Sequence, residues 1–163
     1  MAENQKLVAL RLFLKALDQP EVIETVENRK QLQKAVYLGQ AAGADLGYRF
    51  SWYVMGPYSS QLTEDYYAFE QTATALPEGV ELIPTYAERL AKVRAALRKP
   101  PTFTRIDADW LELLASYHFL RKASGLDHVS AKQRISEQKN HLSDYVELAK
   151  ETLNSCDLLA VGN

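Results

Sequence analysis

The feature that most constrains the fold is a Gly-Pro pair between an aromatic segment and an acidic one, within residues 29–67. In residues 48–55 every second side chain is aromatic or apolar, and alternate side chains of a strand point to opposite faces. We therefore predict a strand with one fully apolar face, followed by a turn at Gly56-Pro57. The apolar face would carry Tyr48, Phe50, Trp52 and Val54.

The Gly-Pro pair also sets the start of the next predicted helix. A side chain at position 56 would not fit between a buried strand and a buried helix. We therefore expect Gly56 to have a positive φ or to lie against another backbone. Pro57 fixes its own φ, and Ser59 or Ser60 can cap a helix that runs to about Ala75.

The helix before this strand carries three cations on its first turns. Residues 25–28 can cap it, and Gly43 can adopt the left-handed conformation that ends it. Arg29, Lys30 and Lys34 oppose the positive end of the helix dipole. Two interpretations stay open: a solvated face, or a contact with phosphate or with an acidic partner.

Apolar periodicity predicts the rest of the chain to be mostly helical. The segments Thr85–Glu88 and Asp109–Glu112 have the spacing of a capping box at a helix start. Val80–Ile83 is a candidate second strand that would pair antiparallel with residues 48–54. The other predicted helices cover residues 4–18, 85–98, 109–122, a short segment from Ser130, and 143–159.

These elements define the expected fold class, mainly α with a small antiparallel β-ribbon (α+β). A chain of 163 residues fits a single domain, residues 1–163. Its first half, residues 1–84, holds the QKAVYL and GPYS motifs, and residues 85–163 form a helical half. Two helices followed by a third helix and a ribbon resemble a winged-helix arrangement in the first half.

Composition excludes several classes of function. The net charge of −2 draws the chain neither to nucleic acid nor to an anionic membrane. A single cysteine, Cys156, forms no internal disulfide, and no cysteine cluster is available for zinc. Lys6, Arg11 and Lys15 interrupt the first apolar segment, so we expect no signal peptide, no membrane span and a cytoplasmic protein. We expect no cofactor.

The chain has no G-x-S-x-G, P-loop, G-x-G-x-x-G or H-E-x-x-H motif. His118, His128 and His141 lack the i, i+3 or i+4 spacing of metal ligands, so we predict no metal site and no catalytic residues. We expect His118 to be packed in the fold rather than to act as a base. A non-enzymatic protein is therefore the leading expectation.

A run of basic residues between 89 and 105 supports a second hypothesis. Six cations in this run could follow a phosphate backbone, which favours a nucleic-acid-binding regulator of winged-helix type. The alternative is a solvated helix face, and the overall charge favours that alternative. The six residues are Arg89, Lys92, Arg94, Arg98, Lys99 and Arg105.

The aromatic residues around the Gly-Pro pair are candidates for recognition, because tyrosine and tryptophan are enriched in interface hot spots. We expect Phe50 and Trp52 inside the fold and the neighbouring tyrosines outside it. The predicted surface for a protein partner consists of Arg49, Tyr53, Tyr58, Ser59 and Gln61.

The segments LQKAVYLGQ and LGYRFSWYVMGPYSSQLTEDY, within residues 31–67, resemble the YwgA-like family of small bacterial and archaeal proteins. They are also distantly similar to the SocA-like antitoxin domain called Panacea. The resemblance implies a helical domain with a small sheet, found near mobile-element or defence genes and acting through protein contacts, as an antitoxin-like module does. It is carried by Gln33, Lys34, Tyr37, Gly56, Pro57, Tyr58 and Ser59.

A third hypothesis concerns Arg134 and His141. Seven positions, or two helical turns, separate them, and they would share one face of a continuous helix. The spacing resembles the ribonuclease motif of the HEPN family. That resemblance implies that His141 would act on a ribose hydroxyl while Arg134 stabilises phosphate.

Overall fold

The computed structural model describes residues 2–72 and 76–160. Within these residues the chain is mainly helical with one two-stranded antiparallel sheet, which confirms the predicted fold class. The elements are α1 (Ala2–Ala16), α2 (Val26–Ala41), β1 (Ser51–Tyr53), β2 (Gly56–Tyr58), α3 (Ser60–Thr72), α4 (Pro84–Leu97), α5 (Asp107–His118), the π-helix η1 (Phe119–Ala123), α6 (His128–Gln138), the 3-10 helix η2 (Asn140–Tyr145) and α7 (Val146–Ser155).

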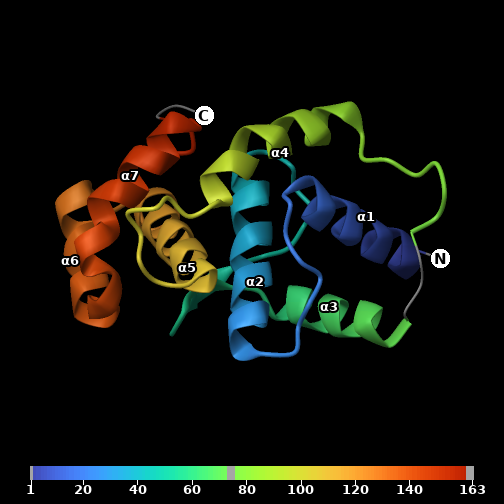
Figure 1. The fold of residues 1–163 in the computed structure, drawn as a ribbon, viewed down its shortest axis with the longest axis horizontal. Helices are drawn as coiled ribbons and strands as arrows, with labels where there is room; N and C mark the ends of the chain where they lie inside the picture. The colour runs from blue at the N-terminus through green and yellow to red at the C-terminus, as the bar shows by residue number, and fades with distance from the viewer. Residues whose placement is uncertain (1, 73–75, 161–163) are drawn as a thin grey trace.

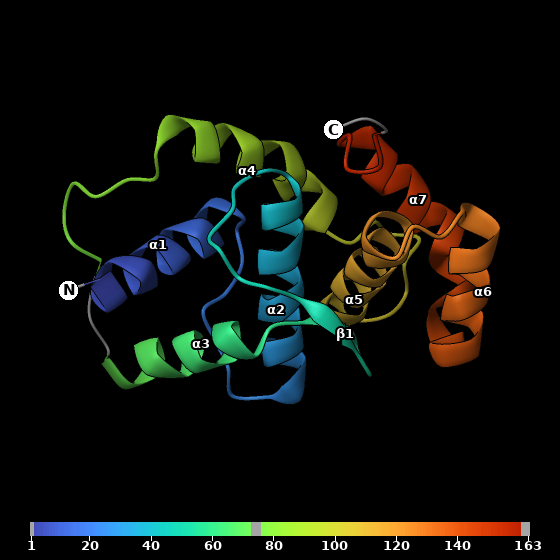
Figure 2. The ribbon, with the colours of Figure 1, turned by 180° about the vertical axis from the view of Figure 1, so that it is seen from behind.

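Helix α2 runs through the middle of the molecule (Figure 1). Helices α1, α3 and α4 lie on one side of it and α5, α6 and α7 on the other, with α5 packed along α2. The hairpin of β1 and β2 lies across α2 and α5 (Figure 2). Because α2 is covered on all sides, every residue from Leu32 to Gly39 is buried, including Gln33 and Lys34.

Both predicted ends of α2 are confirmed. The backbone N–H of Asn28 donates to Thr25 Oγ1 at 3.0 Å, and the Thr25 N–H donates to Asn28 Oδ1 at 3.2 Å. Gly43, just beyond the last turn, has a φ of 108°. These are local interactions, so nearby sequence is enough to specify them.

The sheet differs from the prediction in its second strand. Ser51 pairs with Tyr58 and Tyr53 with Gly56, so the two-residue turn is Val54-Met55 and the Gly-Pro pair lies in β2. The predicted strand 80–83 does not form, and the ribbon that motivated the winged-helix comparison is absent from the described residues. The prediction of a buried Val54 is wrong as well, because turn side chains point to solvent and 90% of this one is exposed.

Two predicted capping boxes are wrong. Helix α4 begins at Pro84 after Ile83, and no side chain caps its first turn. Helix α5 begins at Asp107, two residues before the predicted cap. The Asp109 carboxylate binds cationic side chains instead of its own backbone.

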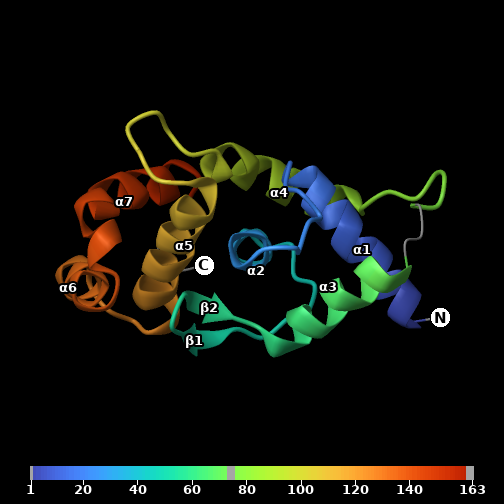
Figure 3. The ribbon, with the colours of Figure 1, turned by 60° about the horizontal axis from the view of Figure 1, so that its bottom comes forward.

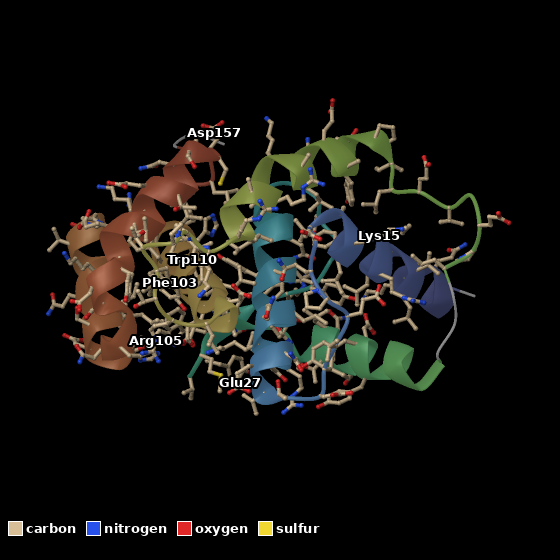
Figure 4. The ribbon with its side chains drawn as sticks, in the orientation of Figure 1. Lys15, Glu27, Phe103, Arg105, Trp110 and Asp157 are labelled. Carbon is tan, nitrogen blue, oxygen red and sulfur yellow. The ribbon has the colours of Figure 1, made fainter. Side chains whose placement is uncertain are left out.

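The segment before α5 is held by aromatic packing. The Phe103 and Trp110 rings lie 5.1 Å apart between centroids, and Trp110 Nε1 donates to Ala96 O at 3.0 Å (Figure 4). This contact joins the end of α4 to the start of α5. The predicted end of the third helix at Ala75 lies outside the described residues.

The predicted last helix is divided in the structure. Residues 140–145 form the 3-10 helix η2, and α7 begins only at Val146. Among the described residues, none of the helices combines the length and the apolar character that a membrane span needs.

Candidate functional site

The site is built from lysines on α2. Lys30 and Lys34 are one turn apart, so they share the face of α2 that meets α5 and the hairpin. Lys30 Nζ donates to Asp109 Oδ1 at 2.9 Å and to Glu112 Oε1 at 2.8 Å. Burial opposes the charge of Lys30, but the hydrogen bonds and charges of the two carboxylates prevail and raise its pKa.

The same carboxylates bind cations from two further segments. Lys139, only 2% exposed, donates from Nζ to Glu112 Oε2 at 2.7 Å and to Val54 O at 2.5 Å. Arg105 Nε donates to Asp109 Oδ2 at 2.8 Å. Asp109 is itself partly desolvated, but these hydrogen bonds lower its pKa. We call Lys30, Lys139, Arg105, Asp109 and Glu112 the ion-pair cluster.

Lys34 bonds to a backbone carbonyl, whereas Lys30 and Lys139 bond to carboxylates. Lys34 Nζ donates to Pro57 O at 2.5 Å, and no carboxylate of the described residues pairs with it. Burial lowers the pKa of Lys34 to about 7, and the charges of Lys139 and Lys30 act in the same direction against that of Glu112. Near neutral pH this ammonium is therefore close to losing its proton.

His141 lies beside the ion-pair cluster. One of its ring nitrogens and one oxygen each of Asp109 and Glu112 lie within 4.8 Å of one another, which is a possible metal-ligand set. Three cations already use these carboxylates, and their charges oppose a metal ion at this place. We therefore interpret the arrangement as ion pairs. Sequence spacing missed it because the residues come from separate elements.

A cavity of about 330 Å³ opens beside Lys34, between the first half of α2, the hairpin and α3. We call it the hairpin cavity. Among the described residues, cations and tyrosines line it and no carboxylate does. Its lining consists of Val26, Arg29, Lys30, Gln33, Lys34, Tyr53, Val54, Met55, Gly56, Tyr58, Thr63, Tyr66 and Tyr67.

The wall of the hairpin cavity is fixed by Gln33. Its Nε2 donates to Ser59 O at 2.8 Å and to Thr63 Oγ1 at 3.0 Å, and its Oε1 accepts from the Ser59 N–H at 2.9 Å. Thr63 Oγ1 lies 2.6 Å from the Tyr58 hydroxyl and 3.3 Å from that of Tyr66. This network joins α2 to the start of α3.

Ser59 has the capping role that the sequence predicted. Its Oγ accepts from the Leu62 N–H at 3.2 Å. The residue is buried, so its place in the predicted partner surface is wrong. The Ser59 hydroxyl caps α3 and is therefore not available to a partner protein.

Gly56 has a φ of 95°, which confirms the predicted positive value. A Cβ atom at this position would lie 2.3 Å from Ser116 Oγ on α5. The close approach lets β2 rest on α5, which places Pro57 O beside Lys34 Nζ. Ser116 Oγ is buried and has no hydrogen-bond partner in the described part of the chain.

Exposed apolar side chains surround the mouth of the hairpin cavity. Tyr53 and Val54 are 54% and 90% exposed, and the Tyr53 and Tyr58 rings are 5.1 Å apart. Both predicted tyrosines thus line the cavity, although Tyr58 is only half-exposed. Arg49 and Gln61 are exposed as predicted but lie outside the lining. We define the apolar collar as Val26, Tyr53, Val54, Met55 and Tyr67.

The expected burial of Phe50 and Trp52 is met in part. Both are half-buried and pack on the core. Trp52 Nε1 donates to Gln138 Oε1 at 3.1 Å, and its ring lies 5.6 Å from Lys139 Nζ. The side of the hairpin opposite the collar is therefore a structural contact with the C-terminal helices.

The structure separates the six cations of the basic run. Arg89 donates to Gly43 O at 2.8 Å, and Lys99 donates to Arg105 O at 2.7 Å, while Arg105 pairs with Asp109. These three therefore have contacts inside the fold. The hypothesis of nucleic-acid binding depends on the other three cations of the run, which are exposed: Lys92 and Arg94 on α4, and Arg98 just after its end.

Arg134 and His141 do not share a helix. The α-helix ends at Gln138, and Lys139 has φ −141° and ψ 55°, which lie outside the helical region. The assumption of two turns on one face is therefore wrong, although both residues are exposed. The ribonuclease hypothesis loses the geometry on which it was based.

The other two histidines form hydrogen bonds within the fold. His118 Nε2 bonds to Leu158 O at 3.1 Å and must carry the proton there, so Nδ1 accepts from the Tyr37 hydroxyl at 2.7 Å. Burial lowers the pKa of His118 to about 4, which keeps it neutral. The expectation that His118 is a packed residue is confirmed. His128 bonds to the buried Tyr117 hydroxyl at 2.8 Å and joins α5 to α6.

A second hollow of about 660 Å³ lies between α1 and residues 77–86. Among the described residues most of its lining is apolar, and the polar side chains are those of Gln5, Glu81 and Tyr86. Polar groups do not converge in it. The hairpin cavity is therefore the stronger candidate for a specific site.

No family model, curated protein or solved structure matches this chain. The functional argument below rests on the geometry of the hairpin cavity and its collar.

Proposed function

We propose that the protein is a non-enzymatic interaction module that binds a partner protein at the hairpin cavity and its apolar collar. The observation that carries the proposal is the concentration of exposed apolar side chains around one cavity. Among the residues whose side chains the structure describes, five of the ten exposed large hydrophobic residues belong to the collar. Such clusters on a protein surface are typical of interaction sites.

The rigidity of the cavity supports a binding role. Gln33 and Ser59 fix its wall by reciprocal hydrogen bonds, and the ion-pair cluster fixes the lysines behind it. A site that is ordered before binding loses less conformational entropy when the partner arrives. Tyr53 and Tyr58 would then serve as aromatic anchors with few rotatable bonds.

Site-specific photo-crosslinking in cells of the source organism tests this proposal. A photoreactive phenylalanine analogue replaces Tyr53 in one protein and Val129 in another. Val129 is 72% exposed on α6 and lies outside the cavity, so it is the matched control. We expect a discrete crosslinked species from position 53 and none from position 129.

Competition completes the test. Unlabelled wild-type protein should suppress the crosslink, and a Tyr53→Ser, Met55→Ser double variant should suppress it at least about tenfold less, because it lacks two collar side chains. No crosslink from position 53, equal crosslinks from both positions, or equal competition by the two proteins would contradict the proposal. A crosslink to a second copy of this chain would identify the partner as the protein itself.

A further inference from the structure

We propose that the hairpin cavity receives the carboxylate of an aspartate or glutamate side chain from the partner, placed against Lys34, and that binding takes up a proton. This inference rests on the proposed function and specifies the chemistry that the site recognises. Three observations support it: the hydrogen bonding of Lys34, the balance of charge around it, and the nature of the cavity wall.

The first observation is that Lys34 is left incompletely bonded. An ammonium group has three N–H donors. One donates to Pro57 O, and the described residues offer no further acceptor to the other two. Lys34 lines the hairpin cavity, so an acceptor that enters the cavity can reach it. A carboxylate would supply the missing acceptor with the opposite charge.

The second observation is the charge balance. Glu112 and Asp109 are shared among Lys30, Lys139 and Arg105, which already exceed them by one charge. A protonated Lys34 makes four cations against two carboxylates. Arg29, at the cavity edge, donates to Ile23 O at 2.9 Å and faces no carboxylate in the described structure. The cavity therefore favours an anion on charge alone.

The third observation concerns the wall. The rings of Tyr53, Tyr58 and Tyr66 form an apolar lining suited to the methylene groups of an acidic side chain. Apolar walls lower the local dielectric constant, so a charge pair formed there is stronger than one on an open surface. The collar outside would contact apolar residues that flank the acidic one. These features favour a peptide carboxylate over a free inorganic ion.

The proton uptake follows from the surroundings of Lys34. Lys30 on its own helix and Lys139 repel its charge, and Glu112 on α5 attracts it. The titratable groups with which the hairpin and α3 line the cavity are the hydroxyls of four tyrosines, Tyr53, Tyr58, Tyr66 and Tyr67. Since the pKa of Lys34 is about 7 in the free protein, an incoming carboxylate raises it. Affinity must therefore fall as pH rises above 7.

Binding of small probes to wild-type protein tests the inference without any substitution. The probe is phenylacetate, which joins a carboxylate to a ring, and the matched control is phenylacetamide, its neutral isostere. Backbone amide NMR signals of Gly56 and Tyr58 report binding at the cavity. We expect phenylacetate to bind about tenfold or more tightly at pH 6 than at pH 8.5, because the protonated fraction of Lys34 falls by that order. Phenylacetamide should show weaker binding with no pH dependence.

Two further arms sharpen the result. Lys34→Arg keeps its charge at every pH, so its phenylacetate binding should not change between pH 6 and 8.5. Phenyl phosphate carries nearly two charges and tests whether phosphate is the true ligand. The inference is overturned if phenylacetamide binds as well as phenylacetate, if wild-type binding does not change with pH, or if phenyl phosphate binds more tightly.

The proposed function is tested separately. A crosslink from position 53 with no phenylacetate binding would show that the collar recognises a partner without an acidic group. Phenylacetate binding with no crosslink would show an anion site that serves no protein partner. The two experiments can therefore contradict one proposal without contradicting the other.

Discussion

Figure 3 looks down α2, with α5 and the hairpin on one side of it and α4 on another. Cations on these two sides have opposite roles. On the side of α5 and the hairpin, Lys34 and Lys139 are buried to within 2% of full coverage, and carbonyl or carboxylate oxygens bind them. On the side of α4, Arg94 and Arg98 are exposed, with no ion-pair partner in the described structure. Side chains of the same formal charge are therefore bound within the fold on one side of α2 and solvated on the other.

Desolvation explains the difference. A buried ammonium costs several kcal/mol unless an opposite charge and hydrogen bonds compensate it, so each partner in the ion-pair cluster depends on the others. An exposed guanidinium keeps its water and contributes little to stability. The basic run 89–105 is dense in cations, yet two of the three cations in the ion-pair cluster, Lys30 and Lys139, come from other parts of the sequence.

The largest expected effect comes from removing Glu112, which binds both Lys30 and Lys139. Glu112→Gln should lower the free energy of unfolding by about 3–5 kcal/mol, because it leaves the buried Lys139 without an opposite charge and Lys30 with Asp109 alone. Denaturant-induced unfolding followed by circular dichroism measures the change. Glu147→Gln, at an exposed ion pair with His128 and Lys132, is the control and should leave the midpoint nearly unchanged. Equal effects of the two substitutions would refute the contrast between buried and exposed charges.

The second largest effect on stability is expected from Gly56→Ala. The positive φ and the contact with Ser116 together predict a loss of about 2–4 kcal/mol. Gly47→Ala is the control, because Gly47 has a φ of 88° and open space around it, so it measures strain without the contact. Thermal and denaturant unfolding of both variants gives the difference.

A second substitution isolates the contact. Ser116→Gly removes the atom that a Cβ at Gly56 would meet, so it should recover part of the loss in Gly56→Ala. No recovery in the double variant would show that backbone strain alone accounts for the effect of Gly56→Ala. The close approach of β2 to α5 would then be less important than the structure indicates.

The third prediction concerns pH. The pKa of Lys34 is about 7 in the folded protein against 10.5 in the unfolded chain. Between these values the unfolded chain holds more protons, so the contribution of Lys34 to stability rises with pH by about 1.4 kcal/mol per unit. Wild type should therefore gain about 2–3 kcal/mol relative to Lys34→Met between pH 7.5 and 9.5.

Urea unfolding of the two proteins at both pH values checks this prediction. Subtracting the free energy of unfolding of Lys34→Met from that of wild type removes the contributions of groups that both proteins contain, such as the tyrosines and Lys30. Parallel curves of stability against pH would mean that Lys34 titrates normally. The proton uptake proposed for the hairpin cavity would then be excluded as well.

The smallest effect is expected on α4. Arg94→Gln combined with Arg98→Gln should change stability by less than about 0.5 kcal/mol, because both side chains are exposed. The same variant tests the nucleic-acid hypothesis. If wild type retards a DNA or RNA probe in a gel at low salt, the variant should retard it less, and binding should weaken steeply as salt rises. No retardation by wild type would exclude that hypothesis.

Several features were predictable from the sequence because neighbouring residues specify them. The cap of α2 at Thr25, its end near Gly43, the positive φ of Gly56 and the cap by Ser59 all depend on contacts within a few residues. Backbone sterics and short-range hydrogen bonds act at this range whatever the rest of the chain does. The fold class followed from the same local signals.

The partners of the cations could not be predicted in this way. The sequence of its own helix left two interpretations for Lys30, a solvated face or a contact with an anion. The two carboxylates that it binds lie 79 and 82 residues away, on α5. The spacing of Asp109 and Glu112 predicted a cap, yet the partly buried Lys30 binds both carboxylates. Alternation in residues 48–55 predicted a strand but did not say which segment would pair with it.

The sequence by itself determined the helices, the ends of α2, and the conformation at Gly56. Only the tertiary structure decided that Lys34 lies at a cavity that no carboxylate of the described residues lines, while Lys30 and Lys139 share Glu112. The physical reason is that burial, unlike a helix cap, is set by the whole fold. The charge state of a lysine depends on every group that the fold brings around it.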